Sequence, residues 1–81
     1  MKIIVEYFAV VAEIAQTASE CVMLADGATA CDLLGEIHRR HPVLGRQGFV
    51  PLLAVNRRHA DPDTKLADGD EVAVLPPLSG G

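Results

Sequence analysis

Four stretches of the chain carry the apolar pattern of β-strands. Residues 2–8 (KIIVEYF) are rich in β-branched and aromatic side chains, and their alternation places Ile3, Val5 and Tyr7 on one face. The other three stretches are shorter runs of residues that also favour strands. They predict strands at residues 19–24, 52–56 and 71–75.

Helical periodicity is strongest between Thr29 and Pro42. Thr29 is the expected N-cap, with Asp32 three residues later as its capping-box partner. Pro42 is expected to end this main helix. A shorter helix is predicted at residues 9–16, which contain better helix formers than their neighbours. The main helix is expected to place on one face Ala30, Leu33, Leu34, Ile37 and His41.

Strands on either side of one main helix predict an α+β domain, with a mixed sheet and the helix packed across one face. The first and last strands are apolar enough to be neighbours at the centre of that sheet. Residues 43–51 are expected to form a loop, and the polar residues 57–66 a turn with a short strand beside it. The folded domain is therefore expected at residues 1–75, followed by an extended tail at residues 76–81.

Composition narrows the classes of function. The chain has 81 residues, of which 49% are hydrophobic, so it is expected to form one small globular domain. A net charge of −4 repels phosphate backbones, and one Tyr and two Phe offer little base stacking, so no nucleic acid partner is expected. The longest apolar stretch, residues 3–15, contains Glu6 and Glu13 and fits neither a membrane span nor a signal peptide. We therefore expect a cytoplasmic protein without a membrane partner, in which Cys21 and Cys31 are reduced.

No group of side chains predicts an active site that works alone. Cys21 and Cys31 are ten residues apart, and with His38 and His41 they do not match the spacing of a zinc site, so no metal is expected. Cys31 lies in the first turn of the main helix, whereas both histidines lie at its other end, too far away to activate the thiol. Both cysteines are expected to be small buried thiols. The acidic residues near the last strand are expected to form a solvated rim: Asp61, Asp63, Asp68, Asp70 and Glu71.

The last six residues are the remaining candidate for chemistry. Pro76 and Pro77 end the final strand, because neither has an N–H to donate, and they favour an extended exit from the sheet. Transfer of AMP to a terminal carboxylate would form a mixed anhydride, from which a sulfur nucleophile gives a thiocarboxylate and an amine an amide. A frayed end without function is the alternative, since Gly and Ser are common at chain termini. The residues after the prolines have little side-chain bulk: Leu78, Ser79, Gly80 and Gly81.

The C-terminal stretch resembles the signature of the molybdopterin synthase small-subunit family. The resemblance is carried by residues 66–81 (LADGDEVAVLPPLSGG), by Ala54-Val55-Asn56 and by Phe8-Ala9 after the first strand. The helix that begins after Thr29 fits the same pattern, so the resemblance covers nearly the whole chain. It implies a ubiquitin-like β-grasp fold, in agreement with the order of strands and helix.

The resemblance also implies a role for Gly81 as the residue that carries sulfur. A partner that resembles a ubiquitin-activating enzyme would adenylate the Gly81 carboxylate with ATP and Mg²⁺, and a sulfur donor protein would supply the sulfur of the thiocarboxylate. The chain itself would bind no cofactor. The carrier with its thiocarboxylate would then bind a large subunit and donate its sulfur there. The synthase that the two subunits form is expected to be a heterotetramer. The large subunit would hold the catalytic residues and convert cyclic pyranopterin monophosphate to the dithiolene of molybdopterin.

The family pattern assigns further residues to contacts with these partners. The tail from Pro76 to Gly80 would insert into the large subunit. Phe8 and Leu75 match positions of an apolar docking patch on the sheet, although core packing explains either residue as well. His59 stands at a middle-strand position of that patch that is usually apolar in the family, which puts its contribution to docking in doubt.

Three other functions stay open. The chain could be a sulfur carrier for another pathway, such as thiamin or cysteine synthesis. It could be a ubiquitin-like modifier whose Gly81 forms an isopeptide bond with a lysine. It could also be an interaction domain with an inert tail, in which case deleting Gly80 and Gly81 would change nothing.

Overall fold

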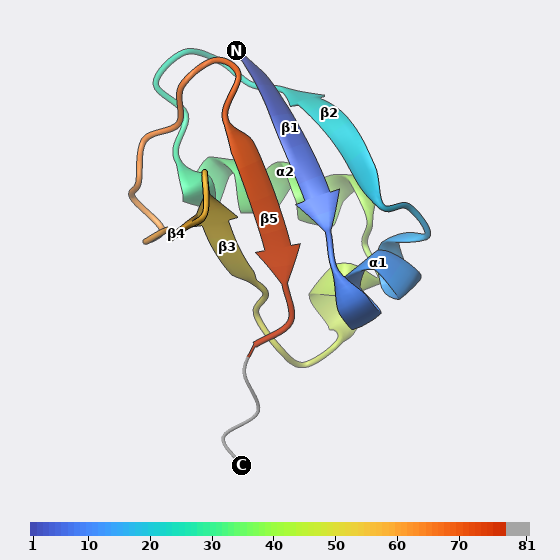
Figure 1. Cartoon of the computed structure of the whole chain (residues 1–81). Coiled ribbons are helices and arrows are strands. Elements are labelled where there is room, and N and C mark those ends of the chain that lie inside the picture. Colours follow the sequence, from blue (N-terminus) through green and yellow to red (C-terminus); the bar gives the residue numbers. More distant parts are fainter. Residues whose placement is uncertain (78–81) are drawn as a thin grey trace.

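The sheet contains five strands in the order β2-β1-β5-β3-β4, and helix α2 lies across one of its faces (Figure 1). The computed structural model describes residues 1–77. The predicted strands and helices are confirmed to within one residue at either end, as is the α+β class. The elements in chain order are β1 (Lys2–Tyr7), α1 (Ala9–Ala15), β2 (Ser19–Met23), α2 (Ala30–Arg40), the 3₁₀ helix η1 (Leu44–Arg46), β3 (Leu52–Val55), β4 (Arg58–His59) and β5 (Glu71–Leu75).

The first and last strands are neighbours at the centre of the sheet, as predicted. β1 pairs in parallel with β5, and Tyr7 lies opposite Val74. β2 pairs antiparallel with β1, and β3 pairs antiparallel with β5, so the sheet is mixed. A parallel pair needs a long crossover connection, and here that connection includes α2. The same connection therefore joins the halves of the sheet and covers one face of it.

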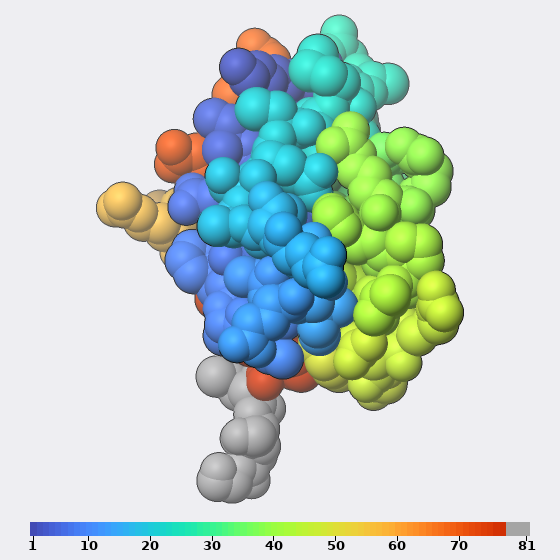
Figure 2. All heavy atoms as spheres, turned by 90° about the vertical axis from the view of Figure 1, so that its right-hand side faces the viewer, coloured from blue at the N-terminus to red at the C-terminus, as the bar shows by residue number. Residues whose placement is uncertain are grey.

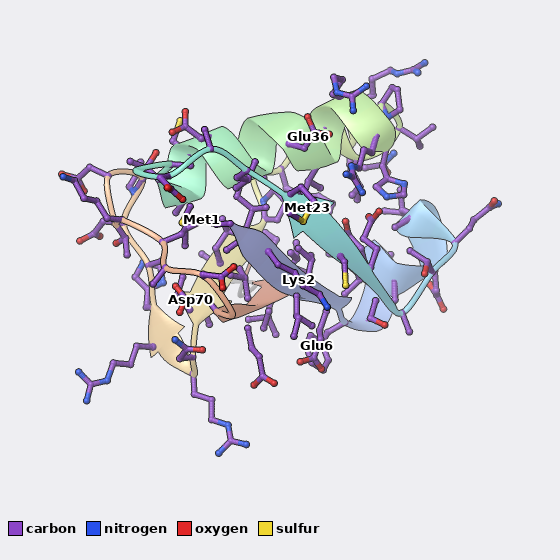
Figure 3. The ribbon with its side chains drawn as sticks, turned by 90° about the horizontal axis from the view of Figure 1, so that it is seen from above. Met1, Lys2, Glu6, Met23, Glu36 and Asp70 are labelled. Carbon is purple, nitrogen blue, oxygen red and sulfur yellow. The ribbon has the colours of Figure 1, made fainter. Side chains whose placement is uncertain are left out.

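The core lies between α2 and the covered face of the sheet. Ile3 and Val5 alternate inward along β1 and are fully buried, as the sequence pattern predicts. Leu33 and Ile37 of α2 are fully buried against them. Glu6 alternates to the opposite side and points away from α2 (Figure 3). No element among residues 1–77 covers that opposite face, which we call the open face.

A capping box begins α2 at the predicted residues. The Thr29 Oγ1 atom accepts a hydrogen bond from the Asp32 backbone N–H at 3.3 Å, and the Asp32 carboxylate accepts one from the Thr29 N–H at 2.9 Å. Each bond satisfies a backbone donor that the first helical turn leaves without an intrahelical partner. The helix N-terminus is thus specified locally, by residues adjacent in the sequence.

A polar cluster joins the other end of α2 to β1 and β2. The Glu20 carboxylate accepts hydrogen bonds from Tyr7 at 2.5 Å and Arg40 at 3.0 Å, and lies 2.6 Å from His41 Nε2. Burial alone raises the pKa of Glu20, but the hydrogen bonds with Tyr7, His41 and Arg40 outweigh it, so this pKa lies below its ordinary value. Burial, and then the hydrogen bond to Glu20, raise the pKa of the Tyr7 phenol above its ordinary value. The cluster therefore keeps the carboxylate charged and the phenol protonated at neutral pH.

The expectation of buried thiols is wrong, because Cys21 and Cys31 are both exposed and free. Cys21 precedes Val22, which is fully buried, so alternation along β2 turns the Cys21 side chain to the open face. Cys31 follows the buried Ala30 and faces outward on the first turn of α2. The residue type alone therefore did not indicate whether either cysteine is buried. The alternation with the neighbouring buried residues, Val22 and Ala30, decides it.

The stretch after α2 is more ordered than the predicted loop. It contains the 3₁₀ helix η1, whose Leu44 is fully buried in the core. α1 packs against η1, so a segment that precedes α2 in the sequence meets one that follows it. The predicted short strand in the polar stretch is β4, which has only two residues and forms one edge of the sheet.

Candidate functional site

The candidate site begins where β5 leaves the sheet. β5 lies between β1 and β3 and ends at Leu75, after which Pro76 is half-buried and Pro77 is exposed. The prolines end the strand as predicted. The remaining tail residues predicted to act, Leu78, Ser79, Gly80 and Gly81, lie outside the described residues, so their roles stay predictions.

Asn56 fixes the start of β5 through the turn between β3 and β4. Its backbone N–H donates to the Glu71 carbonyl at 2.8 Å, and its side-chain oxygen accepts from the Glu71 N–H at 3.0 Å. Its side-chain amide also donates to the Asp70 carboxylate at 2.9 Å. Asn56 adopts a positive φ of 48°, which Asn tolerates better than most residues in a tight turn. The strand that leads to the tail is therefore anchored at its first residue.

Phe8 and Leu75 come together at the other end of β5. The Phe8 N–H donates to the Val74 carbonyl at 3.1 Å, which extends the parallel register and places Phe8 beside Leu75. Leu52 lies opposite Leu75 on the other side of β5. All three belong to the open face, because their neighbours Tyr7, Val74 and Leu53 point into the core. The predicted docking residues Phe8 and Leu75 thus form one apolar surface at the base of the tail.

A hollow of about 250 Å³ lies next to this surface on the open face. Charged and polar side chains gather at the end of the hollow away from the tail, whereas Phe8 borders it on the tail side. The open face therefore changes from polar at the start of β5, near Glu71, to apolar at its end, near Leu75. The hollow is lined by Glu6, Phe8, Ala54, Asn56, Arg57, Glu71 and Ala73.

His59 lies apart from Phe8 and Leu75. It belongs to the edge strand β4, in register with Ala54, and β3 separates it from β5. The expectation of a middle strand at this position is therefore wrong, because β4 pairs with β3 on one side only and forms the edge of the sheet. His59 is exposed and also borders a second, apolar hollow of about 250 Å³ between α2 and β3.

Sequence reasoning missed three exposed valines near the base of the tail. Val10 lies in α1, Val43 precedes η1 and Val50 precedes β3, and each exposes at least 40% of its surface. Nothing in their sequence context separates them from the buried valines, so only the structure identifies them. No group of three or more His, Cys, Asp or Glu side chains within residues 1–77 could hold a metal ion. In the same part of the chain, no helix is long and apolar enough to cross a membrane.

The sheet order, the central parallel pair and the single helix across one face define a ubiquitin-like β-grasp fold. The site on this fold is the last strand with its apolar surface and proline exit. The model of the ThiS family matches residues 5–81, and the chain belongs to this family.

Two curated relatives are similar over most of their length. The molybdopterin synthase sulfur carrier subunit of Chlamydomonas reinhardtii is 43% identical over 83 residues, which cover 100% of both chains. The human protein of the same name is 37% identical over 78 residues, which cover 93% of this chain and 89% of the human one.

Two solved structures are also similar. SAMP1, a small archaeal modifier protein from Haloferax volcanii, has a TM-score of 0.88 and 29% identity, and the match covers 100% of both chains. A chain in the complex of subunits 1 and 2 of the molybdopterin-converting factor from Helicobacter pylori has a TM-score of 0.68 and 26% identity, again over 100% of both chains.

Proposed function

We propose that this chain is the sulfur-carrier subunit of a molybdopterin synthase, in the biosynthesis of the molybdenum cofactor. The observation that carries the proposal is the 43% identity, over the full length of both chains, to a curated sulfur carrier subunit of molybdopterin synthase. The geometry supports the same function, because β5 leads from the centre of the sheet to Pro76 and Pro77, beside the apolar surface of Phe8 and Leu75.

The proposed chemistry takes place at the Gly81 carboxylate, as the end of the tail. The carboxylate attacks the α-phosphorus of ATP, pyrophosphate leaves, and the resulting acyl adenylate has AMP as a good leaving group. Sulfur at the oxidation level of hydrosulfide then displaces AMP, loses its proton and leaves a thiocarboxylate on Gly81; if the donor protein offers a persulfide instead, a thiol must reduce the acyl disulfide that forms. The thiocarboxylate sulfur bonds to a carbon of cyclic pyranopterin monophosphate, and water then cleaves the acyl–sulfur bond and returns the Gly81 carboxylate. Two such transfers supply the two sulfur atoms of a dithiolene.

The proposed partners supply the catalytic side chains. An adenylating enzyme similar to ubiquitin-activating enzymes would bind ATP and Mg²⁺, and a sulfur donor protein would supply the sulfur. The large synthase subunit would bind the charged tail and the pterin substrate, in a heterotetramer of two small and two large subunits. The Helicobacter pylori complex of subunits 1 and 2 supports a partnership of this kind.

Mass spectrometry of the untagged protein tests the proposal. The protein is incubated with its adenylating partner, ATP and a sulfur source, then alkylated and fragmented. Replacement of oxygen by sulfur adds nearly the same mass as oxidation of Met or Cys, so the fragments must locate the change. We expect an alkylated thiocarboxylate on Gly81, and none when ATP is omitted. An unmodified Gly81 beside a demonstrably active adenylating enzyme would contradict the proposal.

A ubiquitin-like modifier is the second candidate, favoured by the similarity to SAMP1. Both functions begin with adenylation, but a modifier ends in an isopeptide bond between Gly81 and a lysine. Immunoblots of cell extract separate them, because conjugates form a ladder above the 8.6 kDa chain. A ladder that disappears on deletion of Gly81 would support the modifier, and its absence together with dithiolene formation by the large subunit would exclude it.

A further inference from the structure

Exposed apolar side chains gather at one end of the molecule. In the described part of the chain, every large apolar side chain that is exposed belongs to this end, with the exception of Met23. Phe8 lies on the open face, as described above. The other three form what we call the valine collar, with exposed fractions of 40% for Val10, 50% for Val43 and 69% for Val50.

The collar residues lie at the end of the molecule where β5 leaves the sheet (Figure 1), and Val50 also borders the hollow between α2 and β3. Leu52 pairs with Leu75, so continuing this antiparallel register places Val50 alongside Pro77. The bond from the Phe8 N–H to the Val74 carbonyl brings the start of α1, and with it Val10, to the end of β5. α1 packs against η1, which Val43 precedes. Figures 1 and 2 show α1, the segment around η1 and the end of β5 at the same end of the molecule.

The length of the tail limits how far a partner can stay from the collar. Gly81 lies four residues beyond Pro77, and four fully extended residues span at most about 14 Å. A partner that receives Gly81 in a closed channel must therefore bring the mouth of that channel close to Pro77. The surface at this end of the molecule includes the collar, whose three valines are exposed. Exclusion of water from such side chains favours binding, and charged groups opposite them would be left without partners.

We propose that the valine collar binds the rim of the tail-receiving channel in the large synthase subunit, and that this rim is apolar and uncharged. The inference rests on the proposed function and adds a second contact to it. The surface of Phe8 and Leu75 would bind along the open face, whereas the collar would bind end-on around the tail. The two contacts together would hold the tail in line with the channel.

Single aspartate substitutions in the collar test this inference. We expect V10D, V43D and V50D each to weaken binding to the large molybdopterin synthase subunit of the same organism about tenfold or more, because each places a charge against an apolar rim. Isothermal titration calorimetry with the purified subunits measures the affinity. V10D is the least disruptive to the fold, because α1 has no acidic residue in its first turn, where negative charge is favourable.

The matched control is M23D, at the last residue of β2, which lies at the other end of the molecule from the collar (Figures 1 and 3). Met23 exposes 67% of its surface and lies opposite Lys2, so an aspartate there is exposed and can face a positive charge. We expect M23D to bind like the wild-type chain. Urea unfolding checks that each variant is folded. Where an aspartate at a collar position prevents folding, the threonine variant at that position is measured instead. Threonine is expected to weaken binding less than aspartate but measurably.

The outcomes separate the collar from the proposed function. If the wild-type chain binds and the collar variants bind equally well, the inference is wrong and the proposed function stands. A loss as large in M23D as in the collar variants would also overturn it, because charge anywhere on the surface would then suffice. If the wild-type chain itself does not bind the large subunit, the proposed function is wrong, and the inference with it.

Discussion

The two faces of the sheet use the same strands for different purposes. On the covered face, Val72 and Val74 of β5 are fully buried beneath α2. On the open face, Ala73 and Leu75 of the same strand are half-buried and lie beside Phe8. A five-residue strand thus supplies core packing with one set of side chains and part of the apolar surface beside Phe8 with the other. Because the two sets alternate, changes on one face can be made with little effect on the other.

Deletion of Gly81 should show most clearly that the proposed function can be lost without loss of stability. We expect loss of all sulfur transfer to the large subunit, since the residue that would carry the sulfur is gone. The free energy of unfolding should stay within about 0.5 kcal/mol of the wild-type value, because the deletion removes no side chain from the core. Dithiolene formation and urea unfolding measure the two quantities. A substantial loss of stability would show that the tail also supports the fold.

Ile3 and Ile4 compare the two faces with one kind of substitution. Ile3 is fully buried on the covered face, whereas Ile4 is half-buried on the open face. We expect I3A to cost about 2–5 kcal/mol of stability and I4A less than half of the loss seen for I3A. Urea denaturation at pH 7 gives both values. Equal losses would mean that the open face is packed as tightly as the core.

Glu20 tests the polar cluster on the covered side. We expect E20Q to cost about 1–3 kcal/mol at pH 7, because it removes one of the two carboxylates that Arg40 bonds and weakens the bonds from Tyr7 and His41. The Glu20 pKa lies below its ordinary value of 4.5, so its stabilising effect is present above pH 4.5 and is lost as the pH falls through the lower, folded-state pKa.

Unfolding measured at pH 7, 4.5 and 3 checks this sign. Wild-type stability should fall over this range, and the fall should be smaller in E20Q. The control is E36Q, since hydrogen bonds from Arg39 and then Arg40 lower the pKa of Glu36 to about 2, but on the surface, where water screens them. A pH dependence unchanged by E20Q would place the acid sensitivity elsewhere.

Thr29 gives the smallest expected effect. T29A removes the side-chain half of the capping box and should cost about 1 kcal/mol, without changing affinity for a partner. T29S keeps the hydroxyl and should retain nearly all of the stability. Thermal unfolding of the three chains measures the difference. A loss in T29S equal to that in T29A would indicate that the Thr methyl group matters more than the cap.

The features predicted correctly depend on residues close together in the sequence. The capping box at Thr29 and Asp32, the alternation in β1 and the prolines after β5 are all local. The features that were missed depend on packing between distant segments. The polar cluster joins Tyr7, Glu20 and His41 from three parts of the chain, and Leu44 is buried in a core built by distant elements, with α1 packed against η1.

The candidate site divides in the same way. The proline exit and the Phe8–Leu75 surface could be predicted, since the two prolines locate the first and the family pattern named both residues of the second. The valine collar could not, because the exposure of a valine depends on which elements surround it. The exposed cysteines were misjudged for the same reason, although each adjoins a buried residue in the sequence.

The parallel pairing of β1 with β5 also has a consequence for synthesis of the protein. β5 is translated after every other element of the sheet, yet it occupies the central position between β1 and β3. A nascent chain that lacks β5 has no partner for the inner edges of β1 and β3, so the sheet cannot close until translation of this strand is complete. The Phe8–Leu75 surface and the chain segment that bears Gly81 therefore become available almost together. Prematurely terminated chains would present neither, so the proposed adenylating partner would not meet incomplete carriers.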